Sequence, residues 1–337
     1  MEFFKKKKKV GLVLGSGAAR GLAHIGVIKA LKEGNVHVDM IAGTSIGALV
    51  GACYAKKGEI ADFEEVVLKT DWKQLLQLAD LNLAVMFKGF VQGQKVKELL
   101  KTIIGDIEFK DLKIPLAVVA TDVNTGEEVI IEKGSVAEAV RASISIPVVF
   151  MPTKFKDKFL VDGGIVNPVP VDVIKKMGAT SIIVCNVIQS LSERKAAKKQ
   201  KNLKTKETKV VGEKIVSDKS VLFTALDNQI NSIIRENSGK MEKFQKVVND
   251  LKRKIPGIPQ DVDANTPNIF DVLVQVLYAM EYEIVKLKAQ EADIMIEPDI
   301  GNIATLEFYR GEEAILEGYK AAREALLVGG KGGRPRN

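Results

Sequence analysis

The pattern of apolar and polar residues predicts a chain in which strands and helices alternate. Short apolar runs at Val10–Leu14, 38–42 and 179–187 are typical of buried strands, and the segments 22–33 and 48–55 are typical of helices. The order continues with predicted strands at 115–121 and 127–131, paired as a hairpin, strands at 158–161 and 292–296, and helices at Ile269–Lys288 and 310–327. We therefore expect an α/β protein with a central mixed sheet flanked by helices.

A G-x-S-x-G motif lies between the predicted strand 38–42 and the predicted helix 48–55. It reads Gly43-Thr44-Ser45-Ile46-Gly47. A turn of this kind between a strand and a helix holds the serine hydroxyl on a sharp, exposed bend, and Gly43 and Gly47 let the backbone turn without a Cβ clash. Ser45 is therefore the candidate nucleophile. The alternative is that the two glycines only allow tight packing of the strand against the helix.

A serine nucleophile needs a group that removes its proton. The chain has two histidines, His24 in an apolar helix and His37 in a loop, and a lone histidine on an apolar helix face is more often packed than catalytic. Asp162 instead ends a short predicted strand, and Gly163 and Gly164 after it free the backbone. Asp162 is the better candidate base, with an ordinary Asp-Gly hairpin turn as the alternative.

A loop of small residues at 15–21 follows the first predicted strand and opens a helix. Such a loop presents unpaired N–H groups and the positive end of the helix dipole, which suits a developing oxyanion, and Arg20 adds a positive charge. A dinucleotide-binding turn is the competing interpretation. Arg20 occupies the place of its third glycine, however, and no acidic residue clearly ends a second strand. A phosphate-binding P-loop is excluded because no Gly-Lys-Ser/Thr follows.

Taken together, these motifs resemble the patatin-like phospholipases, most closely the small bacterial members and the catalytic domain of neuropathy target esterase. The resemblance runs from residue 9 to about 187 and resumes from 268 to about 327. The family motifs are matched by Arg20-Gly21, by Ala-His-Ile-Gly-Val at 23–27, by Ala-Gly-x-Ser-Ile-Gly at 42–47, by Ala-Ser-x-x-x-Pro at 142–147, and by Asp-Gly-Gly with Asn-Pro-x-Pro at 162–170.

The resemblance implies a patatin-like three-layer fold and a Ser-Asp dyad without a histidine base. It implies Ser45 as nucleophile, Asp162 as base, and an oxyanion hole formed by the N–H groups of Gly17 and Ala18 near Arg20. It also implies hydrolysis of carboxylic ester bonds in lipids through an acyl-serine intermediate, with no metal and no cofactor. The loop departs from the all-glycine run of many members at Ser16 and Ala18, and alanine adopts a positive φ less readily than glycine.

Composition and charge indicate the compartment in which the protein works and the partners that it can bind. The 337 residues are 46% hydrophobic, enough for a substantial core, yet no run of eighteen apolar residues appears and no signal peptide is recognisable at the start. Cys53 and Cys185 lie in apolar contexts, which predicts buried, reduced thiols. We expect a cytoplasmic protein, with peripheral contact at the inner face of the membrane as an option.

The excess positive charge is concentrated in one segment. Residues 191–266 hold seventeen Lys and Arg against ten Asp and Glu, which accounts for the whole net charge of +7. After a basic linker, 3.6-residue periodicity predicts two amphipathic helices, at 221–234 and 241–255. The segment is either a basic cap that rests on anionic lipid or a pair of helices that pack on the core or on a second copy in a homodimer. Nucleic-acid binding is not supported, because the basic stretch lacks interleaved aromatic residues.

The expected organisation has five parts: a basic tail at 1–9, a catalytic core at 10–190, a helical insertion at 191–266, a C-terminal part of the core at 267–328 and a disordered tail at 329–337. The expected partner is a lipid ester substrate. Phospholipids, lysophospholipids and neutral esters are all compatible with the motifs. A catalytically weak lipid-binding or regulatory module that retains the motifs is the alternative function.

Overall fold

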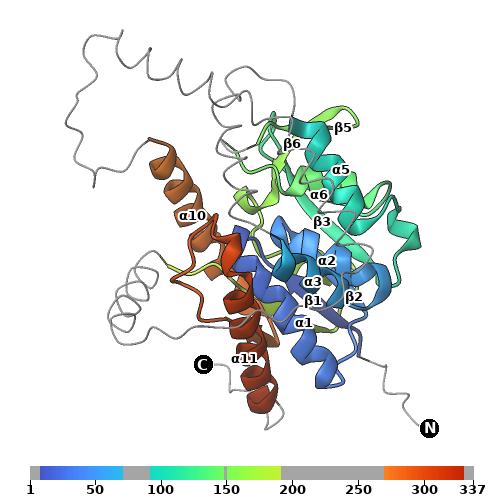
Figure 1. Ribbon diagram of the computed structural model, residues 1–337, viewed down its shortest axis with the longest axis vertical. Coiled ribbons are helices and arrows are strands. Elements are labelled where there is room, and N and C mark those ends of the chain that lie inside the picture. The colour runs from blue at the N-terminus through green and yellow to red at the C-terminus, as the bar shows by residue number, and fades with distance from the viewer. Residues whose placement is uncertain (1–7, 71–91, 148–149, 191–268, 330–337) are drawn as a thin grey trace, which may run out of the picture.

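The computed structural model describes residues 8–70, 92–147, 150–190 and 269–329, in which a sheet lies between two layers of helices (Figure 1). The strands of these residues are β1 (Val10–Leu14), β2 (Met40–Thr44), β3 (Leu116–Asp122), β4 (Glu128–Ile131), β5 (Thr153–Phe155), β6 (Lys158–Asp162), β7 (Ser181–Cys185) and β8 (Ile294–Ile296). The helices are α1 (Ala23–Glu33), α2 (Ile46–Lys57), α3 (Ala61–Lys69), α5 (Gln92–Ile104), α6 (Val136–Ser143), α7 (Val171–Lys176), α10 (Ile269–Lys288) and α11 (Gly311–Gly329). Single helical turns are η1 (Ala18–Leu22), η2 (Phe109–Asp111), η3 (Gly163–Ile165), η4 (Ala289–Glu291) and η5 (Phe308–Arg310).

The sheet is mixed, as the sequence predicts. Its strand order is β5-β6-β3-β2-β1-β7-β8, and β4 pairs with β3 outside this path. The pairs among β3, β2, β1, β7 and β8 are parallel, whereas β4 and β6 run antiparallel to β3. A parallel centre needs helical crossovers on both faces, which explains the alternation of strands and helices along the chain.

Alternation of side chains along β1 shows that both faces of the sheet are buried. Leu12 and Leu14 belong to the core under α1, α2, α3, α6 and α11, whereas Val13 belongs to the core on the opposite face, which α7 and the end of α10 complete with Ile174 and Val285. This period of two is the geometry of a strand covered on both sides. The predicted three-layer fold is confirmed.

Two strands meet end to end along one edge of β3. Val118 and Val119 pair with both β2 and β4, and Ala120 pairs with both β4 and β6, so β2 and β6 share the edge opposite β4. Because β2 is parallel and β6 antiparallel to β3, their carboxyl ends face each other there. Thr44, the last residue of β2, is level with Val119, and Asp162, the last residue of β6, is level with Ala120.

Helix α11 attaches the C-terminal part of the chain to its start by lying along α1 (Figure 1). The close approach depends on a glycine in each helix. A Cβ on Gly26 would collide with the carbonyl oxygen of Ile315, and a Cβ on Gly318 would collide with that of Ala23. Larger residues at either position would therefore push the helices apart.

Most predicted elements are present, with small shifts at their ends. The helix at Ile269–Lys288 and the hairpin of β3 and β4 are confirmed. The strand predicted at 38–42 lies two residues later, at Met40–Thr44, and the final helix continues to Gly329, the first residue of the tail predicted as disordered. The insertion helices predicted at 221–234 and 241–255 and the tails 1–7 and 330–337 lie outside the described residues.

Two further predictions concern cysteines and the membrane. Cys53 and Cys185 are buried and form no disulfide, as expected, and burial raises the pKa of the Cys53 thiol to about 12. Among the helices that the structure describes, none is both long and apolar enough to cross a bilayer.

Candidate active site

Ser45 occupies a strained turn between β2 and α2. Its backbone has φ 56° and ψ −122°, a conformation that is costly for a residue with a side chain, and its N–H donates to Ser143 Oγ at 2.7 Å. Gly43 and Gly47 do not have positive φ. They are needed because a Cβ on Gly43 would lie 2.7 Å from Ala48 Cα and one on Gly47 would collide with the carbonyl oxygen of Leu14. The two glycines thus allow β2 to pack tightly against α2, and this tight packing forms the turn that carries Ser45.

The serine does not lie on an open bend. Ser45 is 4% exposed, so access to its hydroxyl is through a cavity and not from the outer surface. Strained backbone at a non-glycine residue that lines a cavity is a common feature of functional sites.

Asp162 faces Ser45 because β2 and β6 end at the same point of β3. Ser45 Oγ donates a hydrogen bond to Asp162 Oδ2 at 2.5 Å, and the N–H of Gly164 donates to Oδ1 at 2.8 Å. The backbone of Asp162 is held by its N–H bond to the carbonyl oxygen of Ser145 at 2.9 Å and by the Thr121 hydroxyl on its own carbonyl. Gly163 is required beside it, since a Cβ there would collide with the Val119 carbonyl oxygen.

Burial raises the pKa of the Asp162 carboxyl group to about 6, although the hydrogen bonds from Ser45 and Gly164 act in the opposite direction. The carboxyl group is therefore ionised at neutral pH and still basic enough to accept a proton. A pKa near the working pH is the property that general base catalysis requires.

The loop between β1 and α1 presents two backbone N–H groups at the cavity. Ser16 N–H binds the carbonyl oxygen of Pro168 at 2.8 Å and Ala19 N–H binds that of Thr305 at 3.1 Å, which fix the loop on either side. No acceptor among the described residues pairs with the N–H groups of Gly17 and Ala18, and both residues line the cavity. Gly17 has φ 151° and Ala18 φ 49°.

The conformation of Ala18 carries a steric cost. A left-handed φ costs a residue with a Cβ about 1–2 kcal/mol. Ala18 has such a φ although many members of the family have glycine at this position. Other contacts of the loop must offset this cost.

Arg20 supports the loop through the contacts of its side chain. Its side chain is fully buried, with Nε 3.2 Å from the carbonyl oxygen of Val187 and Nη1 3.3 Å from that of Ile303. Its guanidinium group lies 4.8 Å from the centre of the Tyr278 ring, a cation–π contact. In the part of the chain that the structure describes, Arg20 is not among the residues that line the cavity.

Neither histidine is placed to act as the base for Ser45. His24 is fully buried, with Nε2 2.8 Å from the Gly15 carbonyl oxygen and Nδ1 3.0 Å from Cys185 Sγ, and burial lowers its pKa to about 4. His37 is largely exposed and lies 3.6 Å from the Asp39 carboxylate. Neither lines the cavity, which agrees with the preference for Asp162.

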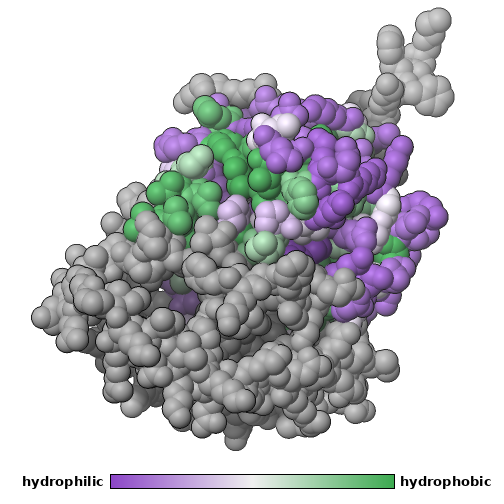
Figure 2. Space-filling model, turned by 90° about the horizontal axis from the view of Figure 1, so that it is seen from above, coloured by the Kyte–Doolittle hydropathy of each residue, from purple (hydrophilic) through white to green (hydrophobic). Residues whose placement is uncertain are grey.

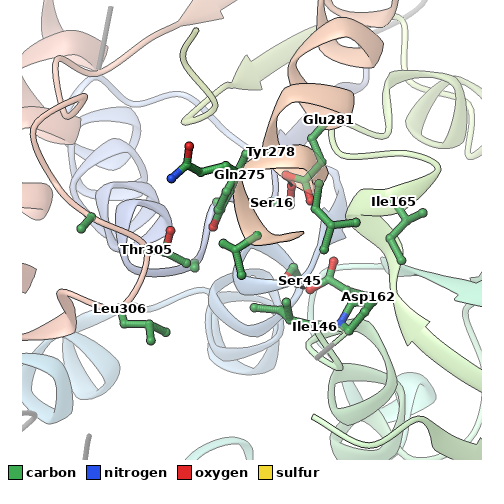
Figure 3. Close-up of a pocket in the computed structure, with 16 residues that line it drawn as sticks. Ser16, Ser45, Ile146, Asp162, Ile165, Gln275, Tyr278, Glu281, Thr305 and Leu306 are labelled. Atoms are coloured by element: carbon green, nitrogen blue, oxygen red, sulfur yellow. Dashed lines mark hydrogen bonds between the residues drawn. The ribbon is translucent and has the colours of Figure 1, made fainter. Parts of the chain in front are cut away.

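The cavity has a volume of about 440 Å³ and mixes a polar floor with apolar walls (Figure 3). Ser45, Asp162, Ser16, Gly17 and Ala18 form one part of its lining. The remaining lining residues are mainly apolar and come from the segments around β6 and from the C-terminal part of the chain: Ile146, Pro147, Ile165, Val274, Gln275, Leu277, Tyr278, Glu281, Ala304, Thr305 and Leu306. Pockets of this size and character are typical of sites for small or extended apolar ligands.

Sequence reasoning missed Glu281, a carboxyl group of α10 at this cavity. Ser16 Oγ donates to Glu281 Oε2 at 3.1 Å. The only signal in the sequence was that Glu281 falls on the same helical stripe as Leu277, Tyr278 and Val285, a position where an apolar residue is expected. No cluster of metal-ligating side chains occurs within the described residues.

The comparisons with known proteins agree with these motifs. A model of the patatin-like phospholipase family matches residues 12–175. An uncharacterized NTE family protein of Mycobacterium tuberculosis is 30% identical over 333 residues, which cover 94% of this chain and 91% of that protein. Neuropathy target esterase sws of Drosophila melanogaster is 37% identical over 186 residues, 53% of this chain and 13% of that protein.

Among solved structures, VipD from Legionella pneumophila aligns with a TM-score of 0.38 and 12% identity over 96% of this chain and 90% of that chain. The family assignment rests on the sequence matches, of which the one to the mycobacterial protein covers 94% of this chain. The chain belongs to the patatin-like phospholipase family, within which it groups with the NTE family proteins.

Proposed function

We propose that this protein is a serine lipid acyl hydrolase that works through a Ser45–Asp162 dyad. The observation that carries the proposal is the 2.5 Å hydrogen bond from Ser45 Oγ to Asp162 Oδ2 inside a cavity with apolar walls. A nucleophile in contact with an ionised carboxylate whose pKa is about 6 has a base ready to receive its proton.

Ser45 Oγ attacks the ester carbonyl carbon while its proton passes to Asp162. The negative charge that develops on the carbonyl oxygen is stabilised by the free N–H groups of Gly17 and Ala18, with the N-terminus of α2 adding its dipole. The alcohol leaves, an acyl-serine intermediate remains, and water releases the fatty acid. Arg20 contributes by holding the oxyanion loop on the carbonyl oxygens of Val187 and Ile303.

The substrate class is a lipid carboxylic ester. Ile146, Ile165, Val274, Leu277 and Leu306 provide apolar contacts that suit an acyl chain, and the family to which the chain belongs is named for phospholipase activity. Catalysis by this arrangement requires water and the ester alone, so the proposal includes no metal and no cofactor.

Reaction with a fluorophosphonate probe tests the proposal, because only an activated serine is modified quickly. We expect the wild-type protein to carry the probe on Ser45, and Ser45→Ala to lose both labelling and ester hydrolysis. Asp162→Asn should lower the labelling rate and kcat/KM by at least about 100-fold, the usual effect of removing a general base. Ser181→Ala, at the start of β7 and away from the cavity, is the matched control. Label on a serine other than Ser45, or full activity of Ser45→Ala, would contradict the proposal.

A further inference from the structure

Glu281 reaches from α10 to the place where Asp162 and the oxyanion loop meet. Figure 3 shows its carboxyl group pointing from α10 toward Ser16, above Ser45 and Asp162. The point where a Cβ on Gly164 would lie is 2.5 Å from Glu281 Oε1, 3.0 Å from Ser16 Oγ and 3.1 Å from Asp162 Oδ1. The carboxyl groups of Glu281 and Asp162 thus both lie close to Gly164, and both residues line the same cavity as Ser45.

The environments of the two carboxyl groups give Glu281 a higher pKa than Asp162. Burial, and next the nearby Asp162 carboxylate, raise the pKa of Glu281 to about 8, while the Ser16 hydroxyl and Arg20 in η1 act in the opposite direction. The pKa of Asp162 is about 6. Between these values Asp162 is ionised and Glu281 holds a proton. A pair of carboxyl groups separated in this way is the arrangement that divides base and acid roles between two residues.

We propose that Glu281 is the general acid of the site and donates its proton to the alcohol that leaves. The inference rests on the proposed function, in which Ser45 and Asp162 begin the reaction. The Ser16 hydroxyl donates to Oε2 and so holds the Glu281 carboxyl group at the cavity that Ser45 also lines.

The proton movements balance over one catalytic cycle. During acylation Ser45 Oγ bonds to the carbonyl carbon, its proton goes to Asp162, and the departing oxygen takes the proton of Glu281 as its bond to carbon breaks. During deacylation water adds to the acyl carbon and gives a proton to ionised Glu281. The bond from carbon to Ser45 Oγ then breaks, and Ser45 recovers the proton held by Asp162. Both carboxyl groups return to their starting states.

Glu281→Gln tests the inference through the choice of leaving group. A nitrophenolate leaves without being protonated, whereas an alkoxide needs a proton, so we compare a nitrophenyl ester and an ethyl ester of the same fatty acid. The measured quantity is kcat/KM, which reports acylation alone. At pH 7 we expect Glu281→Gln to lower kcat/KM for the ethyl ester by about 100-fold and to leave it near wild type for the nitrophenyl ester.

The wild-type pH profile provides a second readout. With the ethyl ester, kcat/KM should fall as pH rises through about 8, because Glu281 then loses the proton that it donates. This fall should be absent in Glu281→Gln. Glu283→Gln is the matched control, because this exposed glutamate of the same helix bonds to Lys286 at 2.9 Å and should change neither quantity.

Each outcome assigns the failure to one proposal. Equal losses on both esters, or no loss on the ethyl ester, would overturn the acid role of Glu281 while fluorophosphonate still labels Ser45. A wild-type protein that the probe does not label would overturn the dyad, and the acid role with it.

Discussion

At the scale of single residues, the site is built from groups that are unfavourable on their own. Ser45 and Ala18 have positive φ angles, and Asp162 and Glu281 are carboxyl groups withdrawn from water. Each lowers the stability of the fold relative to an unstrained or apolar alternative, and surrounding contacts hold each in place. Such concentration at one cavity is the physical argument for the catalytic roles that we propose for these residues.

The pH dependence of acylation tests which residue is the base. Asp162 accepts a proton only when ionised, so kcat/KM should rise with pH through about 6. An ordinary histidine titrates in the same range, but burial keeps His24 neutral with a pKa of about 4. We expect His24→Gln and His37→Gln to keep this rise, measured with a nitrophenyl ester from pH 4.5 to 7.5. If the rise were lost in His24→Gln alone, His24 and not Asp162 would be the base.

The same carboxyl group gives a stability signature with a definite sign. Folding raises the pKa of Asp162 from an ordinary 3.8 to about 6, so its contribution to the free energy of unfolding is fully present below 3.8 and is lost as pH rises through 6. Asp162→Asn removes this loss. The melting temperature of the variant minus that of the wild type should therefore increase between pH 4 and pH 7. A difference between the two that does not change with pH would contradict the raised pKa.

At the scale of elements, the loop between β1 and α1 depends on segments that are far away in sequence. Pro168, Val187, Ile303 and Thr305 supply the carbonyl oxygens that hold the loop between β1 and α1, directly or through Arg20. The helix α10 closes the cavity from the other side and stacks Tyr278 on the Arg20 guanidinium group. The loop is therefore positioned by tertiary contacts more than by its own sequence.

Arg20→Ala should lower both activity and stability. The change leaves two buried carbonyl oxygens without donors, at a cost of about 1–3 kcal/mol each, and frees the loop that carries the Gly17 and Ala18 N–H groups. We expect a lower melting temperature in calorimetry together with a fall in kcat/KM. A fall in kcat/KM with an unchanged melting temperature would instead assign to Arg20 a direct contact with the oxyanion or a lipid phosphate.

At the scale of the whole molecule, α10 lies between the cavity and solvent. One face carries the lining residues Val274, Leu277, Tyr278 and Glu281, and the opposite face exposes apolar side chains: Val272, Leu273, Val276 and Met280, each between 38% and 51% exposed. Figure 2 shows hydrophobic side chains of the described residues gathered in one area of the face seen from above. In sequence this helix directly follows the basic segment 191–266. We propose that this side of the molecule docks on an anionic lipid surface.

Vesicle binding tests the contribution of the basic segment. Replacing Lys195, Lys198, Lys199 and Lys201 by Gln should weaken binding to anionic vesicles, because each basic residue near the surface contributes about 1 kcal/mol. Binding of the wild type should also fall with added salt and with a smaller anionic-lipid fraction. Hydrolysis of a short soluble ester, which needs no surface, is the control and should be unchanged. Binding that is indifferent to charge and salt would identify the segment as a packing or dimer-forming element.

The sequence by itself determined the fold class and pointed to Ser45 and Asp162, the two residues of the proposed dyad. The alternation of apolar runs with helical patterns predicted the mixed sheet, and Ser45 and Asp162 were found because each lies in a local signal, a G-x-S-x-G turn and an Asp-Gly-Gly strand end. Short-range signals of this kind depend on φ preferences and on side-chain periodicity, which are properties of a few neighbouring residues.

Only the tertiary structure decided how these parts meet. The contact of Ser45 with Asp162 follows from the opposite directions of β2 and β6 along β3, and the role of Arg20 follows from carbonyl groups more than 160 residues away. Glu281 became part of the site because α10, which is far from Ser45 and Asp162 in sequence, lines the same cavity. Its raised pKa depends on the water that this packing removes and on the charge that it brings near, neither of which a linear pattern of residues specifies.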